Sequence, residues 1–257
     1  MRIALLTQED PLYILPFFAR FVANAGREIE IVAIYACRSM GKRKRTRLLA
    51  ELFCLYRPGG FLKFAVLQAL ARTQSALGLG QLSSMRQLSE KLRVPYRRID
   101  DPNQPEVVTA LSALNIDVLV SVACPYILKQ DVLAVPARTS INVHHAPLPK
   151  YKGMMPTFWQ MYHGESSVGI TVHEISSKID EGPILHQESL PIIPGESMHQ
   201  LIRRSKEAGA AAVLKVLQQI ASGTVAHVSS SEEKGSYFTF PNRSEMAEFH
   251  RRKLRAI

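Results

Sequence analysis

The sequence predicts an α/β protein built on a doubly wound, mostly parallel sheet. Short apolar segments rich in β-branched residues alternate along the chain with longer segments whose apolar residues recur at helical spacing. One short segment, Asp117–Val122, is predominantly apolar, which is typical of a strand buried on both faces. Because parallel strands need crossover connections of fixed handedness, this alternation favours helices on both faces of one sheet.

The N-terminal region begins the alternation. A strand is predicted over Arg2–Thr7, a helix over Leu12–Ala25 and a second strand over Ile29–Tyr35. Gly26 follows the last helical residue and provides a stop signal. The three segments therefore form a βαβ unit.

Residues 38–84 interrupt the pattern, and we interpret them as a helical and basic insertion. Helical patterns over Leu48–Tyr56 and Phe61–Leu77 are separated by Pro58-Gly59-Gly60. The preceding charges can be a solvated run leading into helices that cover the sheet. The alternative is peripheral contact of 38–77 with anionic lipid or a phosphate-bearing partner. The basic residues are Arg38, Lys42, Arg43, Lys44, Arg45 and Arg47.

The alternation resumes with predicted helices over Leu82–Leu92 and Pro105–Leu114 and strands over Val94–Ile99 and Asp117–Val122. Ligands of open α/β sheets bind beyond the carboxyl ends of the strands. The turn after the last of these strands, Ala123–Leu128, is therefore a predicted pocket wall.

A further strand, Thr139–Val143, is expected to bring two polar side chains to the same edge. Asn142 and His144 are separated by one residue, and side chains alternate with period 2, so both point to one face. The loop from Ser176 to Asp180 is predicted to hold Asp180 at a strand-to-strand reversal. The remaining predicted elements are a helix over Pro156–Tyr162, strands over Gly169–Ile175 and Pro183–Leu190, and a helix over Ser197–Ala221.

Length and composition fit one catalytic domain with a short C-terminal extension. The chain has 257 residues, and we place the domain at 1–225, with the insertion at 38–84, and the extension at 226–257. Hydrophobic residues make up 46% and charged residues 21%, as in globular proteins. Three cysteines without C-x-x-C spacing predict neither disulfides nor a metal site. We find no signal segment or membrane-spanning run and expect a cytoplasmic protein.

Four motifs, in order, resemble the formyltransferases that use 10-formyltetrahydrofolate. Asn142-Val143-His144 precedes a proline-containing turn, Pro147–Gly153, that ends in Tyr-Lys-Gly. A glycine-led strand starts at Gly169, and Asp180-Glu181-Gly182-Pro183-Ile184 follows. The resemblance is strong over 115–190. It implies a Rossmann-like formyltransferase sheet, 10-formyltetrahydrofolate as the cosubstrate, no metal, and a catalytic trio of Asn142, His144 and Asp180.

The reaction implied by the resemblance suits these three side chains. When an uncharged primary amine attacks the formyl carbon, a tetrahedral oxyanion forms. Asn142 can donate its amide N–H to that oxyanion, and a protonated His144 can add a charged donor. Asp180 would favour the imidazolium and help remove the proton from the attacking nitrogen, directly or through water.

The resemblance also implies where the pterin binds, largely through backbone groups. These positions are the turn at Tyr126, Ile127 and Leu128 and the loop at Ser177, Lys178 and Ile179. Other polar side chains nearby have simpler interpretations. We interpret His145 as a surface or turn residue, His173 as a strand residue and Cys124 as a small buried hydrophobe.

The acceptor amine separates three branches of the family. The branch resembling glycinamide ribonucleotide formyltransferase has a glycine-rich phosphate loop, which Thr7–Pro11 lacks. Methionyl-tRNA formyltransferases carry a β-barrel domain after the catalytic domain, and the residues after Ala221 are too few to form one. Because the chain is basic, tRNA remains the runner-up acceptor. We therefore hypothesise a sugar N-formyltransferase acting on an amino sugar attached to a nucleotide or lipid phosphate, as a possible homodimer.

The net charge of +10 would attract such a phosphate, although it is equally compatible with nucleic acid or an anionic membrane. An alternative without catalysis is a folate-binding or interaction module that docks on anionic surfaces. The intact Asn142, His144 and Asp180 argue against it, because a binding module has no need of all three.

Overall fold

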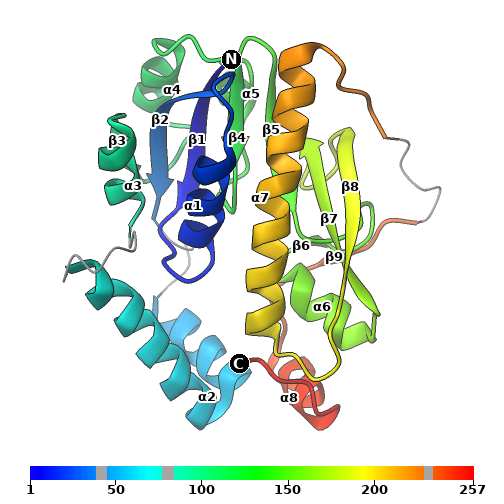
Figure 1. The fold of residues 1–257 in the computed structure, drawn as a ribbon. Coiled ribbons are helices and arrows are strands. Elements are labelled where there is room, and N and C mark those ends of the chain that lie inside the picture. Colours follow the sequence, from blue (N-terminus) through cyan, green and yellow to red (C-terminus); the bar gives the residue numbers. More distant parts are fainter. Residues whose placement is uncertain (39–44, 77–83, 229–233) are drawn as a thin grey trace.

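The computed structural model describes residues 1–38, 45–76, 84–228 and 234–257. Within these residues, seven strands form one sheet in the order β3-β2-β1-β4-β5-β7-β8 (Figure 1). The strands are β1 (Arg2–Gln8), β2 (Glu30–Cys37), β3 (Tyr96–Ile99), β4 (Val118–Ser121), β5 (Thr139–His144), β7 (Ser167–Glu174) and β8 (Ile184–Pro191).

The sheet is parallel from β3 to β5 and antiparallel from β5 to β8. β1 pairs in parallel with both β2 and β4, and β4 pairs in parallel with β5. β7 runs antiparallel to both of its neighbours. The short loop between β7 and β8 leaves no room for a helical crossover, so these two strands form a hairpin. The predicted doubly wound, mostly parallel α/β fold is confirmed.

Helices cover both faces of this sheet. α1 (Ile14–Asn24) and α7 (Met198–Ser222) pack together over one face, where Phe17, Phe18 and Val213 belong to a buried core. α4 (Pro105–Ser112) and α5 (Gln130–Leu133) supply Val107, Leu111 and Val132 to the core of the other face. In Figure 1, α7 runs along the length of the sheet. The carboxyl ends of β1, β4 and β5 consequently meet at one edge.

The insertion forms α2 (Arg45–Ala76), followed by α3 (Met85–Leu92). The predicted break near Pro58 is present as a kink, because Arg57 adopts φ 58° and ψ 167° and proline lacks the N–H that a continuous helix needs. The basic residues Lys42, Arg43 and Lys44, and the predicted helix start at Leu82, lie outside the described residues. None of the described helices has the length and apolar content needed to cross a membrane.

The C-terminal extension contributes to a third buried cluster together with the insertion. α8 (Arg243–Arg251) contacts α2, and Phe249 stacks on Phe158 of α6 (Pro156–His163) with ring centroids 4.7 Å apart. A second small sheet pairs β9 (Tyr237–Phe238) with β6 (Lys152–Gly153). The extension is thus packed against the turn that follows β5, although the proposed domain boundary at 225 stays a prediction.

Candidate active site

The structure brings Asn142, His144 and Asp180 together. Asn142 and His144 lie at the end of β5, and Asp180 lies in the loop between β7 and β8. His144 Nδ1 is 3.5 Å from Asp180 Oδ2, and the two side chains are only 7% and 11% exposed. An imidazole and a carboxylate at this distance interact strongly, because little water screens them.

The hydrogen bond of His144 assigns its protonated nitrogen. His144 Nε2 is 2.8 Å from the carbonyl oxygen of Tyr151. A carbonyl only accepts hydrogen bonds, so Nε2 carries a hydrogen and donates it. Nδ1 is then the nitrogen that faces Asp180, and it is the position from which a protonated ring would donate to a substrate.

Asn142 is oriented by His173, which lies directly opposite it on β7. His173 Nδ1 is 2.7 Å from the Glu174 carbonyl oxygen and must donate to it, which leaves Nε2 to accept from Asn142 Nδ2 at 3.2 Å. Burial lowers the pKa of His173, against the opposing effect of Asp180, and favours this neutral ring. The second amide hydrogen of Asn142 remains available to an oxyanion. His173 is a strand residue, as predicted, but the sequence did not reveal its contact with Asn142.

We expect His173→Leu to lower kcat roughly tenfold or more, because the amide of Asn142 loses the acceptor that fixes its direction. KM for the folate should change little, since His173 is buried. Steady-state kinetics of the purified variant would measure both. A Gln at this position can still accept from Asn142, so His173→Gln should restore part of kcat; equal losses in the two variants would argue against this positioning role.

Asp180 is held by backbone groups. Its Oδ2 accepts from the Gly153 N–H at 2.8 Å, and its own backbone has φ 52°, a left-handed conformation that Asp tolerates better than most residues. Gly153 itself has φ 94°, and a Cβ there would lie 2.3 Å from the Phe238 carbonyl oxygen. The C-terminal strand β9 therefore supports Gly153, which in turn supports Asp180.

Gly182 fixes the other side of the same loop. A Cβ at Gly182 would lie 1.7 Å from the Glu174 carbonyl oxygen, so only glycine fits without moving backbone. The Glu174 N–H donates to the Pro183 carbonyl at 2.9 Å, which closes the base of the loop. In the Asp-x-Gly-Pro segment, the glycine is therefore required by the lack of space, whereas the aspartate is expected to take part in the chemistry.

Of the six predicted folate-binding residues, Tyr126, Ile127 and Leu128 lie in the turn after the carboxyl end of β4. Ser177, Lys178 and Ile179 lie in the β7–β8 loop, just before Asp180. Ile127 and Ile179 are exposed apolar side chains, 55% and 39% accessible, and could contact an aromatic ring. Leu128, in contrast, is buried in the sheet core, so its side chain cannot contact a ligand and only its backbone could. Tyr126, Ser177 and Lys178 retain accessible surface.

Two further titratable residues, His145 and Lys206, lie outside the predicted site set. His145 lies in the bend after β5, in agreement with its interpretation as a turn residue, but it is buried rather than at the surface, and neither ring nitrogen has a hydrogen-bond partner among the described residues. Burial, with smaller effects of Lys206 and His144, lowers the pKa of His145 well below its usual value. Gly209 on α7 makes room for the ring, since a Cβ there would lie 2.9 Å from His145 Cε1.

Lys206 is the second such residue. Burial lowers the pKa of Lys206 to about 8, and Asp10, just after β1, opposes this shift. Lys206 lies three residues before Gly209, which faces the His145 ring, so the two residues lie on the same face of α7. A lysine within a helix sequence carries no sign of burial, which explains why periodicity alone did not identify it.

We expect the protein to lose stability as the pH falls below about 6.5, the ordinary pKa of histidine. Burial is the largest cause of a lowered pKa at His145, His173, His199 and His250. The unfolded chain therefore binds more protons in this range, and each group can contribute at most about 1.4 kcal/mol per pH unit. Urea unfolding at about pH 7.5 and about pH 5.5 would measure the difference in the free energy of unfolding between the two pH values. In His145→Leu this difference should be smaller.

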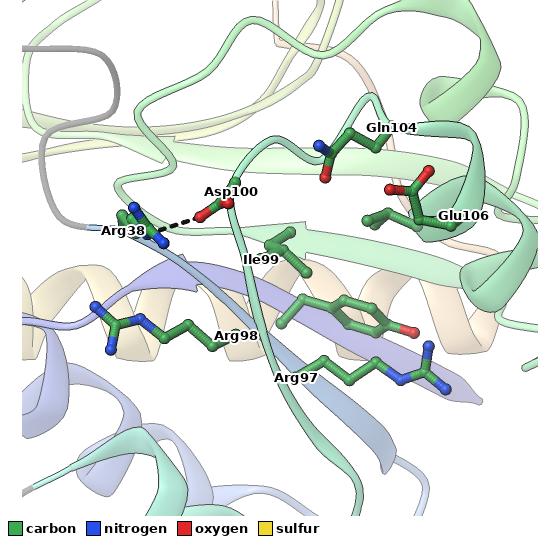
Figure 2. Close-up of a pocket in the computed structure, with 9 residues that line it drawn as sticks. Arg38, Arg97, Arg98, Ile99, Asp100, Gln104 and Glu106 are labelled. Carbon is green, nitrogen blue, oxygen red and sulfur yellow. Dashed lines mark ion pairs between the residues drawn. The ribbon is translucent and has the colours of Figure 1, made fainter.

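One surface groove in the described part of the chain lies away from this site. It has a volume of about 490 Å³ and is lined by residues of β2, β3 and α4, three strands away from β5. Figure 2 shows Arg38 turned toward Asp100, with Nε and Oδ1 2.7 Å apart, while Arg97 and Arg98 point away from each other. Both members of this ion pair are more than half exposed, so solvent screens their attraction. Asn142, His144 and Asp180 do not line the groove.

The fold and the site together define a class. In this open α/β sheet, an amide and an imidazole at the carboxyl end of one parallel strand lie near a carboxylate from a hairpin loop, and such groups are able to stabilise an oxyanion and move a proton. The family profile described as Formyl transferase matches residues 66–217, more than half of the chain. The chain belongs to the formyl transferase family, and the predicted enzyme class is confirmed at the level of the family.

Relatives with curated descriptions include a methionyl-tRNA formyltransferase from Thermosynechococcus vestitus and the bifunctional polymyxin resistance protein ArnA from Wigglesworthia glossinidia brevipalpis. The first is 37% identical over 49% of this chain and 37% of its own length. The second is 31% identical over 61% of this chain and 24% of its own length. The matched regions thus cover less than half of each of these relatives.

Solved structures share the fold. A sugar N-formyltransferase from Shewanella has a TM-score of 0.58 at 15% identity and aligns over 93% of this chain and 76% of its own. A phosphoribosylglycinamide formyltransferase from Anaplasma phagocytophilum has a TM-score of 0.61 at 14% identity and aligns over 93% and 98%. The similarity extends to two branches with different acceptors, so the fold does not select between them.

Proposed function

We propose that this protein transfers a formyl group from 10-formyltetrahydrofolate to a primary amine of a small acceptor. The observation that carries the proposal is the cluster of Asn142, His144 and Asp180: His144 Nδ1 and Asp180 Oδ2 lie 3.5 Å apart, and Asn142 lies two residues before His144 on β5. Its three groups are an amide donor, an ionisable ring and a carboxylate. These supply what formyl transfer to an amine requires.

In the proposed reaction the neutral amine attacks the formyl carbon and forms a C–N bond. Asn142, through its remaining amide hydrogen, and His144, through Nδ1, donate to the oxyanion. Asp180 accepts the proton that the attacking nitrogen loses, directly or through water. The bond from the formyl carbon to the folate nitrogen then breaks, that nitrogen takes up a proton, and the products are the N-formyl amine and tetrahydrofolate.

The proposed acceptor is a phosphate-bearing amine, most simply an amino sugar on a nucleotide or lipid phosphate. Lys206 supports this choice, because it is a basic residue on the face of α7 that is turned toward His145. The net charge of +10 favours an anionic acceptor as well. One structural neighbour was crystallised as a sugar 3N-formyltransferase with dTDP and 5-N-formyl-THF. Transfer to initiator tRNA is the second candidate, supported by the identity to methionyl-tRNA formyltransferases.

The test is incubation of the purified protein with 10-formyltetrahydrofolate and a panel of amino-sugar nucleotides, lipid-linked amino sugars and charged initiator tRNA. Tetrahydrofolate and a product heavier by one formyl group should appear together with one class of acceptor. Binding of the folate without turnover on any acceptor would favour a folate-binding or interaction module instead. A product formed only with tRNA would replace the sugar acceptor by the second candidate.

Lys206→Met tests the phosphate contact. We expect KM for a phosphate-bearing acceptor to rise roughly tenfold or more, since a charge-assisted contact is lost, with little change in KM for the folate. Lys215→Met is a matched control, because Lys215 lies on the same helix and is exposed. Equal effects of the two substitutions would show that general charge, rather than Lys206, attracts the acceptor.

A further inference from the structure

Helix α2 carries a concentration of exposed apolar side chains. Many of the exposed large apolar residues in the described part of the chain lie on this helix. They are Leu49, Phe53, Leu62, Val66 and Leu70. Single exposed apolar residues are ordinary, whereas their accumulation on one element marks an interaction surface.

Three of these residues form a continuous line, which we call the apolar stripe: Leu62, Val66 and Leu70. They are 66%, 48% and 50% exposed. Positions four apart advance by only about 40° around a helix, so the three side chains follow one face. Ala65 and Ala69 fall on the same face and are also exposed, so no charge interrupts it.

The opposite face of this half of α2 is already occupied. The Phe64 ring stacks on Tyr56 with centroids 4.6 Å apart, and Phe61 meets Phe53 edge-on at 5.5 Å. Gly60 allows Ile257 of the C-terminus to approach, since a Cβ there would lie 3.1 Å from it. These ring contacts join the two halves of α2, and Phe61 and Phe64 also pack against the third buried cluster, so the helix is anchored on that side. Figure 1 shows it at the outer edge of the molecule rather than over the sheet.

The charges of α2 restrict what can cover the stripe. Among the side chains of α2 that the structure describes, Arg47, Arg57 and Lys63 are basic and Glu51 alone is acidic, with Glu51 Oε1 3.1 Å from Arg47 Nε. Lys63 is exposed and lies at the border of the stripe. A second copy would bring two basic helices together, which like charge opposes. An anionic bilayer offers both a boundary for apolar side chains and phosphates for basic ones.

We propose that α2 docks the protein peripherally on an anionic lipid bilayer. The apolar stripe enters the boundary between headgroups and acyl chains, and the flanking basic side chains contact lipid phosphates. The proposal does not depend on the acceptor or on catalysis.

Flotation with phosphatidylcholine vesicles, with and without phosphatidylglycerol, tests the proposal with the full-length protein. We expect binding to the mixed vesicles only, weakened by salt but not abolished, because the apolar contact is not screened. The triple substitution Leu62→Glu, Val66→Glu and Leu70→Glu should reduce binding more than tenfold, since each buried Leu alone can contribute about tenfold. Ile193→Glu is the matched control, because Ile193 is also half exposed but lies outside α2.

Circular dichroism and thermal unfolding of the triple variant should match the unmodified protein, since all three side chains are exposed. Equal vesicle binding by the triple variant and the unmodified protein would overturn the proposal, as would binding to neutral vesicles alone. A dimer in light scattering that the triple substitution dissociates, without any vesicle binding, would assign the stripe to a second copy and also overturn it.

Discussion

Asp180→Asn is expected to reduce kcat by roughly three orders of magnitude with little effect on folding. The amide keeps the shape of the carboxylate, and its oxygen can still accept from the Gly153 N–H, which lies 2.8 Å from Oδ2. The substitution removes the negative charge that lies 3.5 Å from His144 Nδ1. It also removes the acceptor for the proton of the attacking amine. Single-turnover kinetics with saturating 10-formyltetrahydrofolate would measure the chemical step.

Glu181→Gln provides the control for this substitution. Glu181 is the next residue and is also a carboxylate, but it contacts Lys152, which lowers its pKa, and not the trio. Its replacement should leave kcat within about twofold of the unmodified protein, because exposed ion pairs contribute little. If Asp180→Asn retained more than about a tenth of the rate, Asp180 would not act as the proton acceptor, since such a role accounts for larger factors.

Gly169→Ala is expected to destabilise the protein by about 3 kcal/mol and to reduce activity at the same time. A Cβ at Gly169 would lie 2.1 Å from the Pro147 backbone nitrogen and 2.4 Å from the Ala146 carbonyl carbon. Both contacts are to backbone, so relief requires the turn after His144 to move. Urea unfolding would give the change in stability, and kcat at a temperature where the variant is folded would give the effect on the site.

A movement of this turn would also disturb the groups that hold His144 in place. Its Ala146 carbonyl accepts from Thr171 Oγ1 at 2.7 Å, and buried Gln160 joins the His145 carbonyl to the Gly169 N–H, each at 2.9 Å. The same turn leads to Tyr151, whose carbonyl accepts from His144. Gly59→Ala is the control, because a Cβ there meets nothing within 4 Å. If Gly169→Ala were as stable as that control, the close approach would not constrain the turn.

The elements that were predicted correctly are those in which local pattern and burial agree. β4 was predicted because Val118–Ser121 is apolar on both sides of the strand, and it is buried on both faces in the structure. α7 follows from its helical periodicity, and in the structure it begins at a capping box on Ser197 and ends at a left-handed Gly223. The short elements α5 and β6 were not predicted, since four or two residues contain too little pattern.

The sequence by itself determined the longer strands and helices along the chain, the placing of Asn142 and His144 on one face, and the motif that contains Asp180. These features follow from the periods of strands and helices and from residues a few positions apart. Only the tertiary structure decided which nitrogen of His144 is protonated, that His173 orients Asn142, and that β9 supports Asp180 through Gly153. Each of these depends on contacts between strands or segments distant in the chain, and periodicity along one element contains no information about its neighbours.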